Sequence, residues 1–215
     1  MKKGFFATEF AAVLLFFVLP PLFAPRPPQV TVMHFPWTTF VLALLALALW
    51  LQIRGQDECE NQHDPAQGFL PRQGQCLVTF GILMASAGLL EAAGHFLAHR
   101  ETAARFLPPQ TISGWANIAV GIPCAAFYEE VLYRAYLPAA LRRCVPAVPP
   151  PVREATAVLA FALAHRYLGW LSVIHAAVAG IALRRCLCQS GRLWTVVAAH
   201  TAYNAVMTAL TFALS

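Results

Sequence analysis

The chain has 215 residues, of which 59% are hydrophobic and only 12% are charged, and its formal net charge is +5 at pH 7. Soluble domains are nearer half apolar and a quarter charged, so this composition excludes an ordinary soluble domain and predicts an integral membrane protein. No basic block with interleaved aromatic residues occurs, so we expect no nucleic-acid partner.

Seven apolar runs predict an all-α fold, a polytopic membrane helix bundle of about seven transmembrane helices. Several runs are shorter than the roughly 20 residues that cross a bilayer straight, so we expect some short or tilted helices. Prolines end the first run, and a stiff proline-rich turn at 146–151 precedes the fifth. The predicted spans are 5–23, 37–53, 76–98, 115–141, 154–168, 170–183 and 193–214.

The basic residues at the ends of these spans predict the orientation. With seven spans, ten lysines and arginines lie on the side of the N-terminus and four on the other side, while Arg134 lies inside a span. This count uses Arg184 and Arg185 as markers of the membrane edge. Basic residues accumulate on the cytoplasmic side. We therefore expect a multi-pass protein of the plasma (inner) membrane with a cytoplasmic N-terminus.

Three charged residues interrupt the fourth predicted span. Glu129, Glu130 and Arg134 lie within six residues of apolar sequence, and each charge costs a few kcal/mol inside a bilayer. On a helix, Glu130 and Arg134 share a face in the favourable order for an ion pair, whereas Glu129 is turned roughly 100° away. The pattern predicts an internal Glu130–Arg134 salt bridge and leaves Glu129 available for chemistry. A purely structural ion-pair network is the alternative.

Histidines on two further spans lie at a similar depth. Counted from the arginines that mark the membrane edge, Glu129, His165 and His200 are roughly 20, 18 and 12 Å deep at 1.5 Å per residue. Ionisable groups at such depth face the bundle interior and partner one another, so we expect these three to converge. Hydrogen bonding between helices without catalysis is the alternative for each histidine.

Each of the two histidines has a companion four residues away on its own helix. Phe161 precedes His165, and its ring can pack beside the imidazole and restrict it. Asn204 follows His200, so an imidazole N–H and an amide NH₂ lie side by side, a pair of donors that suits a developing oxyanion. Glu129 and His165 can hold a water between them, with the carboxylate as general base. Base, water and oxyanion donors together are the equipment for hydrolysing an amide.

Two further residues are expected near this site. Tyr133 is expected to anchor or line the pocket. His175, on the sixth predicted span, has no companion at the spacing of four residues, so we expect it to support the site or to be structural.

Three motifs on separate predicted helices resemble those of the CPBP family of intramembrane proteases. This family includes the CAAX prenyl endopeptidases of the Ras-converting type and many bacterial Abi proteins. The motifs appear in the family's order, over about 90 residues of the C-terminal half. They are Glu129-Glu130-x-x-x-Arg134, Phe161-x-x-x-His165 and His200-x-x-x-Asn204.

The resemblance implies roles for these positions. Glu129 and His165 are similar in position to the family's water-activating pair, and His200 and Asn204 to its oxyanion-stabilising pair. Glu130 and Arg134 are then expected to support the architecture and tune the site. The resemblance also implies one integrated membrane domain, in which 115–215 form the catalytic helical core and 1–114 supply N-terminal helices and connectors.

Two mechanisms stay open at this point. The family is also widely described as metalloproteases, and Glu129, His165 and His200 could form a His₂Glu zinc set with an open position. We favour a glutamate-activated water without a metal or other cofactor, because no His-Glu-x-x-His pair occurs and Asn204 is a poor zinc ligand.

The sequence therefore predicts an intramembrane endopeptidase that hydrolyses a peptide bond near a membrane-anchored or C-terminal segment. Its expected partners are a membrane-associated peptide or protein substrate and the lipid bilayer. The alternative is a non-catalytic membrane immunity or scaffold protein of the same fold. A transporter is a further alternative, and it would be expected to have repeated halves with broken helices. No internal repeat is evident in the sequence, so this alternative lacks its characteristic feature.

Overall fold

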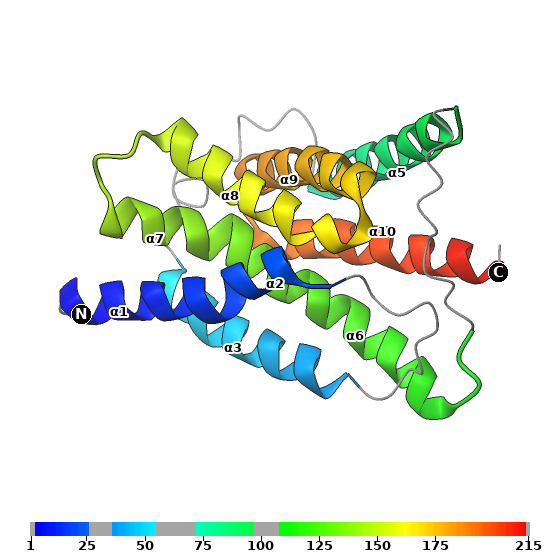
Figure 1. Cartoon of the computed structure of the whole chain (residues 1–215), viewed down its shortest axis with the longest axis horizontal. Coiled ribbons are helices and arrows are strands. Elements are labelled where there is room, and N and C mark those ends of the chain that lie inside the picture. The colour runs from blue at the N-terminus through cyan, green and yellow to red at the C-terminus, as the bar shows by residue number, and fades with distance from the viewer. Residues whose placement is uncertain (1–2, 26–35, 55–71, 97–107, 214–215) are drawn as a thin grey trace.

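A computed structural model of the chain describes residues 3–25, 36–54, 72–96 and 108–213. These residues form an all-α bundle without strands in the described ranges, as predicted (Figure 1). Segments η1 and η2 are π-helical, and η3 is a 3-10 turn. The elements are α1 (Lys3–Val13), η1 (Leu14–Val18), α2 (Leu19–Phe23), α3 (Trp37–Ile53), α5 (Arg72–Phe96), α6 (Ile112–Glu130), η2 (Val131–Tyr136), α7 (Leu137–Cys144), α8 (Pro150–Ala164), η3 (Arg166–Leu168), α9 (Trp170–Ser190) and α10 (Leu193–Ala213).

Every predicted span corresponds to a helical segment. The first is the continuous run α1–η1–α2, and the fourth is the continuous run α6–η2–α7. Among the described residues, four helices are long and apolar enough to cross a membrane, and α3 is apolar but shorter. The chain is therefore an integral membrane helix bundle. The four helices are Phe6–Phe23, Gln73–Gly94, Trp170–Ser190 and Leu193–Ala213.

The run α6–η2–α7 forms the centre of the bundle and crosses the molecule diagonally (Figure 1). Helix α3 packs against α6 and η2, α10 packs against α5 and α6, and α9 packs against α5 and α8. All six residues of η2 are buried, with Val131 and Tyr136 at 0% exposure. The charged motif at the start of η2 therefore lies in the middle of the core.

Both π-helical segments are followed by prolines, and the prolines do not end these helices. A proline has no backbone N–H, so the carbonyl four residues earlier loses its usual donor. Pro21 deprives the carbonyl of Phe17 in this way, and Pro138 deprives that of Arg134. Other helices supply donors to these two carbonyls: the Tyr128 hydroxyl donates to the Phe17 carbonyl at 3.4 Å, and Arg184 Nη1 donates to the Arg134 carbonyl at 2.7 Å.

The bounds of the fifth and sixth spans differ from the prediction. Helix α8 begins at Pro150, inside the predicted turn, because proline fits the first turn of a helix. It ends at Ala164, and Gly169, with φ 104°, then starts α9. Helix α9 continues past 183 to Ser190 and ends at Gly191 in the left-handed conformation, φ 61°.

Arg184, which the orientation count uses as a marker of the membrane edge, lies inside the helix bundle. It is buried within α9. Its Nη2 donates to Glu154 Oε1 at 2.6 Å, and its Nη1 donates to the Arg134 carbonyl. Because its charge is paired and these donors are satisfied, the guanidinium is accommodated inside the protein.

A carboxylate on α1 connects the N-terminal helix to the core. Tyr136, which is fully buried, donates its hydroxyl to Glu9 Oε1 at 3.0 Å, and Gln52 of α3 donates to Glu9 Oε2 at 2.7 Å. One carboxylate thus joins three helices through both of its oxygens. A charged residue in a membrane helix that pairs inside the bundle is the arrangement expected on energetic grounds.

We predict that Glu9→Ala lowers the free energy of unfolding by about 1–3 kcal/mol, because the buried Tyr136 hydroxyl loses its acceptor. Unfolding by SDS in mixed micelles measures this change. Glu9→Gln, which keeps an acceptor oxygen, is the control and should lose less. An unfolding midpoint of Glu9→Ala equal to that of the native protein contradicts the prediction.

Candidate active site

The adjacent carboxylates Glu129 and Glu130 are the last two residues of α6, and Arg134 lies in η2. Short π-helical segments inside α-helices occur frequently at functional sites. The two carboxylates have different surroundings. The Glu130 side chain is 0% exposed, and the Glu129 side chain is 25% exposed. The junction of α6 and η2 therefore presents one carboxylate to a partly open space and buries the other.

The buried Glu130 carboxylate has a positively charged and an imidazole partner. Arg134 Nε lies 3.3 Å from Glu130 Oε2, which confirms the predicted ion pair. His200 Nδ1 of α10 lies 2.7 Å from Glu130 Oε1. A carboxylate in the ionised form only accepts hydrogen bonds, so the imidazole donates. Both contacts compensate a charge that would be very unfavourable if buried alone.

The same imidazole also faces Glu129. His200 Nε2 lies 3.8 Å from Glu129 Oε2, which is too long for a direct hydrogen bond. The ring of His200 thus stands between two carboxylates, bonded to the buried one and separated by a short gap from the accessible one. The predicted proximity of Glu129 and His200 is present in the structure.

His165 lies at the end of α8 and follows its last helical residue. Its Nδ1 is 2.9 Å from the carbonyl oxygen of Phe161. A carbonyl only accepts, so Nδ1 carries a proton, and in the neutral ring Nε2 then carries the lone pair. The backbone of His165, with φ −92° and ψ 4°, lies in the bridge region, where many active-site residues are found. The end of the helix thus fixes the tautomer and the direction of this imidazole.

The ring of Phe161 is the common contact of the site. Its centroid lies 4.6 Å from that of His165 and 6.3 Å from that of His200, both edge to face. Tyr133 packs against it at 5.3 Å. The Arg134 guanidinium carbon lies 3.7 Å from the ring centroid, which is a cation–π contact. The sequence predicted only the packing of Phe161 on His165.

Asn204 and His175 lie at the margin of this cluster. Asn204 is half-buried, one turn beyond His200 on α10, and its side chain has no hydrogen-bond partner in the described part of the chain. His175 Nδ1 lies 3.1 Å from Ser86 Oγ of α5, and its ring packs on that of Tyr203 in a tilted arrangement, with the centroids 5.2 Å apart. His175 also interacts electrostatically with His165 and His200. No pattern in the sequence indicated Ser86.

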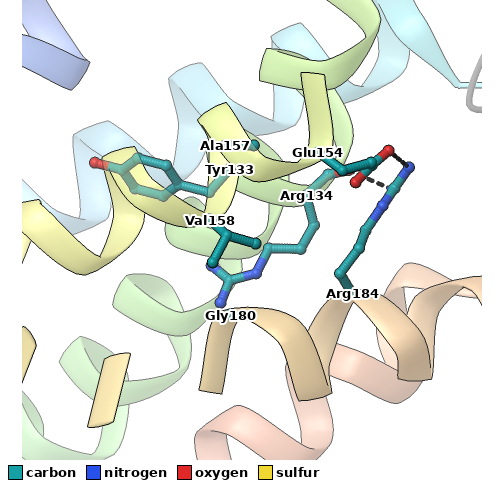
Figure 2. Close-up of a pocket in the computed structure, with 7 residues that line it drawn as sticks. All are labelled: Tyr133, Arg134, Glu154, Ala157, Val158, Gly180 and Arg184. Carbon is teal, nitrogen blue, oxygen red and sulfur yellow. Dashed lines mark hydrogen bonds and ion pairs between the residues drawn. The ribbon is translucent and has the colours of Figure 1, made fainter. Parts of the chain in front are cut away.

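A second cluster of charges lies on the other side of Arg134. Figure 2 shows the Arg184–Glu154 ion pair and the Arg134 guanidinium around one cavity between α8 and α9. This cluster was not predicted, because Arg184 had the spacing of a residue at the membrane edge. The burial of Arg134 and Arg184 side by side depends on Glu130 and Glu154, each of which compensates one guanidinium.

The alternative zinc set was Glu129, His165 and His200. Both imidazoles face an acceptor of the protein with Nδ1, the Glu130 carboxylate and the Phe161 carbonyl respectively, so Nε2 of each is the nitrogen that a metal would use. Over the described ranges, no group of three or more His, Cys, Asp or Glu side chains is arranged to hold a metal ion.

Comparison with known proteins gives one match. Residues 111–206 match the family model described as Rce1-like, type II CAAX prenyl endopeptidase Rce1-like. No curated protein and no solved structure matches the chain. All three motifs lie within the matched residues, and α1 to α5 lie before them. The match confirms the resemblance that the motifs indicated: in residues 111–206 the chain is similar to the CPBP proteases of the CAAX prenyl endopeptidase type.

Proposed function

We propose that the protein is an intramembrane endopeptidase that hydrolyses a peptide bond near a membrane-anchored or C-terminal segment of its substrate. The family match supports a protease that acts on a membrane-associated substrate. The observation that carries the proposal is the accessible Glu129 carboxylate, 3.8 Å from an imidazole that the buried Glu130 holds in place. Keeping an accessible carboxylate and a fixed imidazole donor inside a membrane costs free energy. A hydrolytic reaction needs both groups and therefore explains why they are present.

Glu129 and His165 activate the attacking water in this proposal. His165 Nε2 carries a lone pair, because Nδ1 donates to the Phe161 carbonyl, so it accepts one hydrogen bond from the water. Glu129 accepts the other hydrogen and takes that proton as the water oxygen attacks the peptide carbonyl carbon. The proton then passes to the amide nitrogen as the C–N bond breaks, so Glu129 is regenerated as a carboxylate.

His200 and Asn204 stabilise the negative oxygen of the tetrahedral intermediate in this proposal. The imidazolium form of His200 donates from both nitrogens, Nδ1 to Glu130 and Nε2 toward the oxyanion. Asn204, on the same face of α10, supplies a second donor from a neutral amide. Tyr133 and His175 support the pocket around these groups.

We further propose that the reaction uses no metal, because Asn204 is a poor zinc ligand and the described Glu129, His165 and His200 side chains are not grouped to hold an ion. The orientation expected from the basic residues, a cytoplasmic N-terminus in the plasma (inner) membrane, belongs to the same proposal.

We predict that Glu129→Gln lowers kcat for peptide hydrolysis by about 10²–10⁴-fold, because an amide cannot take the proton from water. The assay uses purified protein in proteoliposomes and a fluorogenic prenylated CAAX peptide. Glu91→Gln, a change of the same kind at an exposed position of α5, should cleave as the native protein does. Cleavage by Glu129→Gln at the native rate would falsify the role of Glu129.

Asn204→Ala is predicted to lower kcat by about 10²–10³-fold with little change in KM, because the variant loses a donor that acts in the transition state. Thr208→Ala, one turn further along α10, removes a hydroxyl that bonds only the Asn204 carbonyl in the described structure and should keep most of the activity. A kcat near the native value in Asn204→Ala speaks against the oxyanion role.

The metal-free mechanism predicts that the purified enzyme contains zinc at well below one equivalent and keeps its activity in 1,10-phenanthroline. Elemental analysis and the same peptide assay measure both properties. Loss of activity in the chelator, followed by recovery when zinc is added, decides for the His₂Glu alternative.

A further inference from the structure

The Arg134 side chain has unsatisfied donors although it is almost completely buried. It is 3% exposed, its Nε faces Glu130, and its flat face lies on Phe161. Neither Nη1 nor Nη2 has a hydrogen-bond partner among the described residues. A guanidinium has five N–H donors, and unpaired buried donors of a charged group are costly. These nitrogens therefore require a ligand.

A cavity adjoins these nitrogens. It is lined by Tyr133 and Arg134 of η2, by residues of α8 and by residues of α9. In Figure 2 the Arg134 guanidinium is directed between Val158 and Gly180, away from Glu154. The room for the centre of a water-sized sphere is about 10 Å³. This is far too small for an organic ligand and is about the room that a single water molecule needs.

The charges around the cavity favour a neutral occupant. Arg134 is compensated by Glu130, and Arg184 is compensated by Glu154, so the cavity carries no excess positive charge for an anion. Water also finds acceptors and donors here, because Glu154 Oε2 has no hydrogen-bond partner in the described residues, and neither have the two Nη atoms of Arg134. A buried water needs two to four such polar partners.

We propose that this cavity is a water-binding site, and that it supplies the second substrate of the hydrolysis. The first part rests on the cavity alone, and the second rests on the proposed function. The Glu154 side chain is 34% exposed and connects the cavity to the protein surface. At the inner end, Arg134 lies on the Phe161 ring, whose edges reach His165 and His200. The water site is thus one aromatic ring away from the proposed catalytic groups.

X-ray radiolytic footprinting of the full chain in lipid nanodiscs tests the water site, because hydroxyl radicals from bound water oxidise the side chains beside it. Val158, which lines the cavity, should be oxidised. Leu159, the next residue of α8, is exposed on the outer surface, where lipid excludes water, and should be oxidised less although leucine is the more reactive type. An unmodified Val158 overturns the proposal.

Gly180→Ala narrows the cavity, since a Cβ at this position lies 3.2 Å from Val158 Cγ1 and 3.6 Å from Phe161 Cδ1. Oxidation of Val158 should fall several-fold in this variant. Gly88→Ala, a glycine of α5 with nothing within 4 Å of the added atom, is the matched control and should leave it unchanged. Equal oxidation of Val158 in Gly180→Ala and in the native protein also overturns the site.

The supply role is tested by peptide hydrolysis in the same variants. Gly180→Ala should lower kcat several-fold and leave KM unchanged, whereas Gly88→Ala should not alter either. A fall in Val158 oxidation with a native kcat overturns the supply role and leaves the water site in place. Oxidation of Val158 does not require catalysis, so Glu129→Gln should show the native oxidation pattern. If the proposed function is wrong, the peptide assay shows it while the oxidation pattern stays unchanged.

Discussion

The structure depends on the compensation of one buried carboxylate. Glu130 is completely buried and is bonded to His200 at 2.7 Å and paired with Arg134 at 3.3 Å. Removing either partner leaves an uncompensated charge in the core, which is strongly destabilising. These contacts join α10 to the junction of α6 and η2, so the energetic requirement of one side chain also sets the distance between two helices. The hydrogen bond to Glu130 also sets the direction of the His200 ring.

The π-helical segments have a related physical cause. Each lies before a proline that cannot donate to the carbonyl four residues earlier, and inside a membrane each freed carbonyl needs another donor. Tyr128 supplies it to Phe17, and Arg184 supplies it to Arg134. The contacts fix the N-terminal helix and α9 against the central helix. The irregular backbone thus provides attachment points that a regular α-helix does not have.

Local features of the fold and the site could be predicted from the sequence, and long-range ones could not. Apolar runs located every helical segment, and the spacing of four residues predicted the Glu130–Arg134 pair and the contact of Phe161 with His165. Counting residues from a membrane edge predicted that His200 lies near Glu129 but not the rotation of its helix. The Glu130–His200 bond depends on that rotation. The burial of Arg184 was not predicted, because it depends on Glu154, which comes from another helix.

In the proposed mechanism, the two adjacent glutamates have different roles because their surroundings differ. Consecutive residues of a helix point about 100° apart, so one carboxylate can enter the core while its neighbour stays accessible. Glu130, held by a guanidinium and an imidazole, is a fixed charge that orients other groups. Glu129 lies 3.8 Å from His200 Nε2, without a direct hydrogen bond to it, and its side chain is 25% exposed. A carboxylate that exchanges protons during a reaction needs to be accessible, whereas a carboxylate that positions an imidazole needs to be held in place.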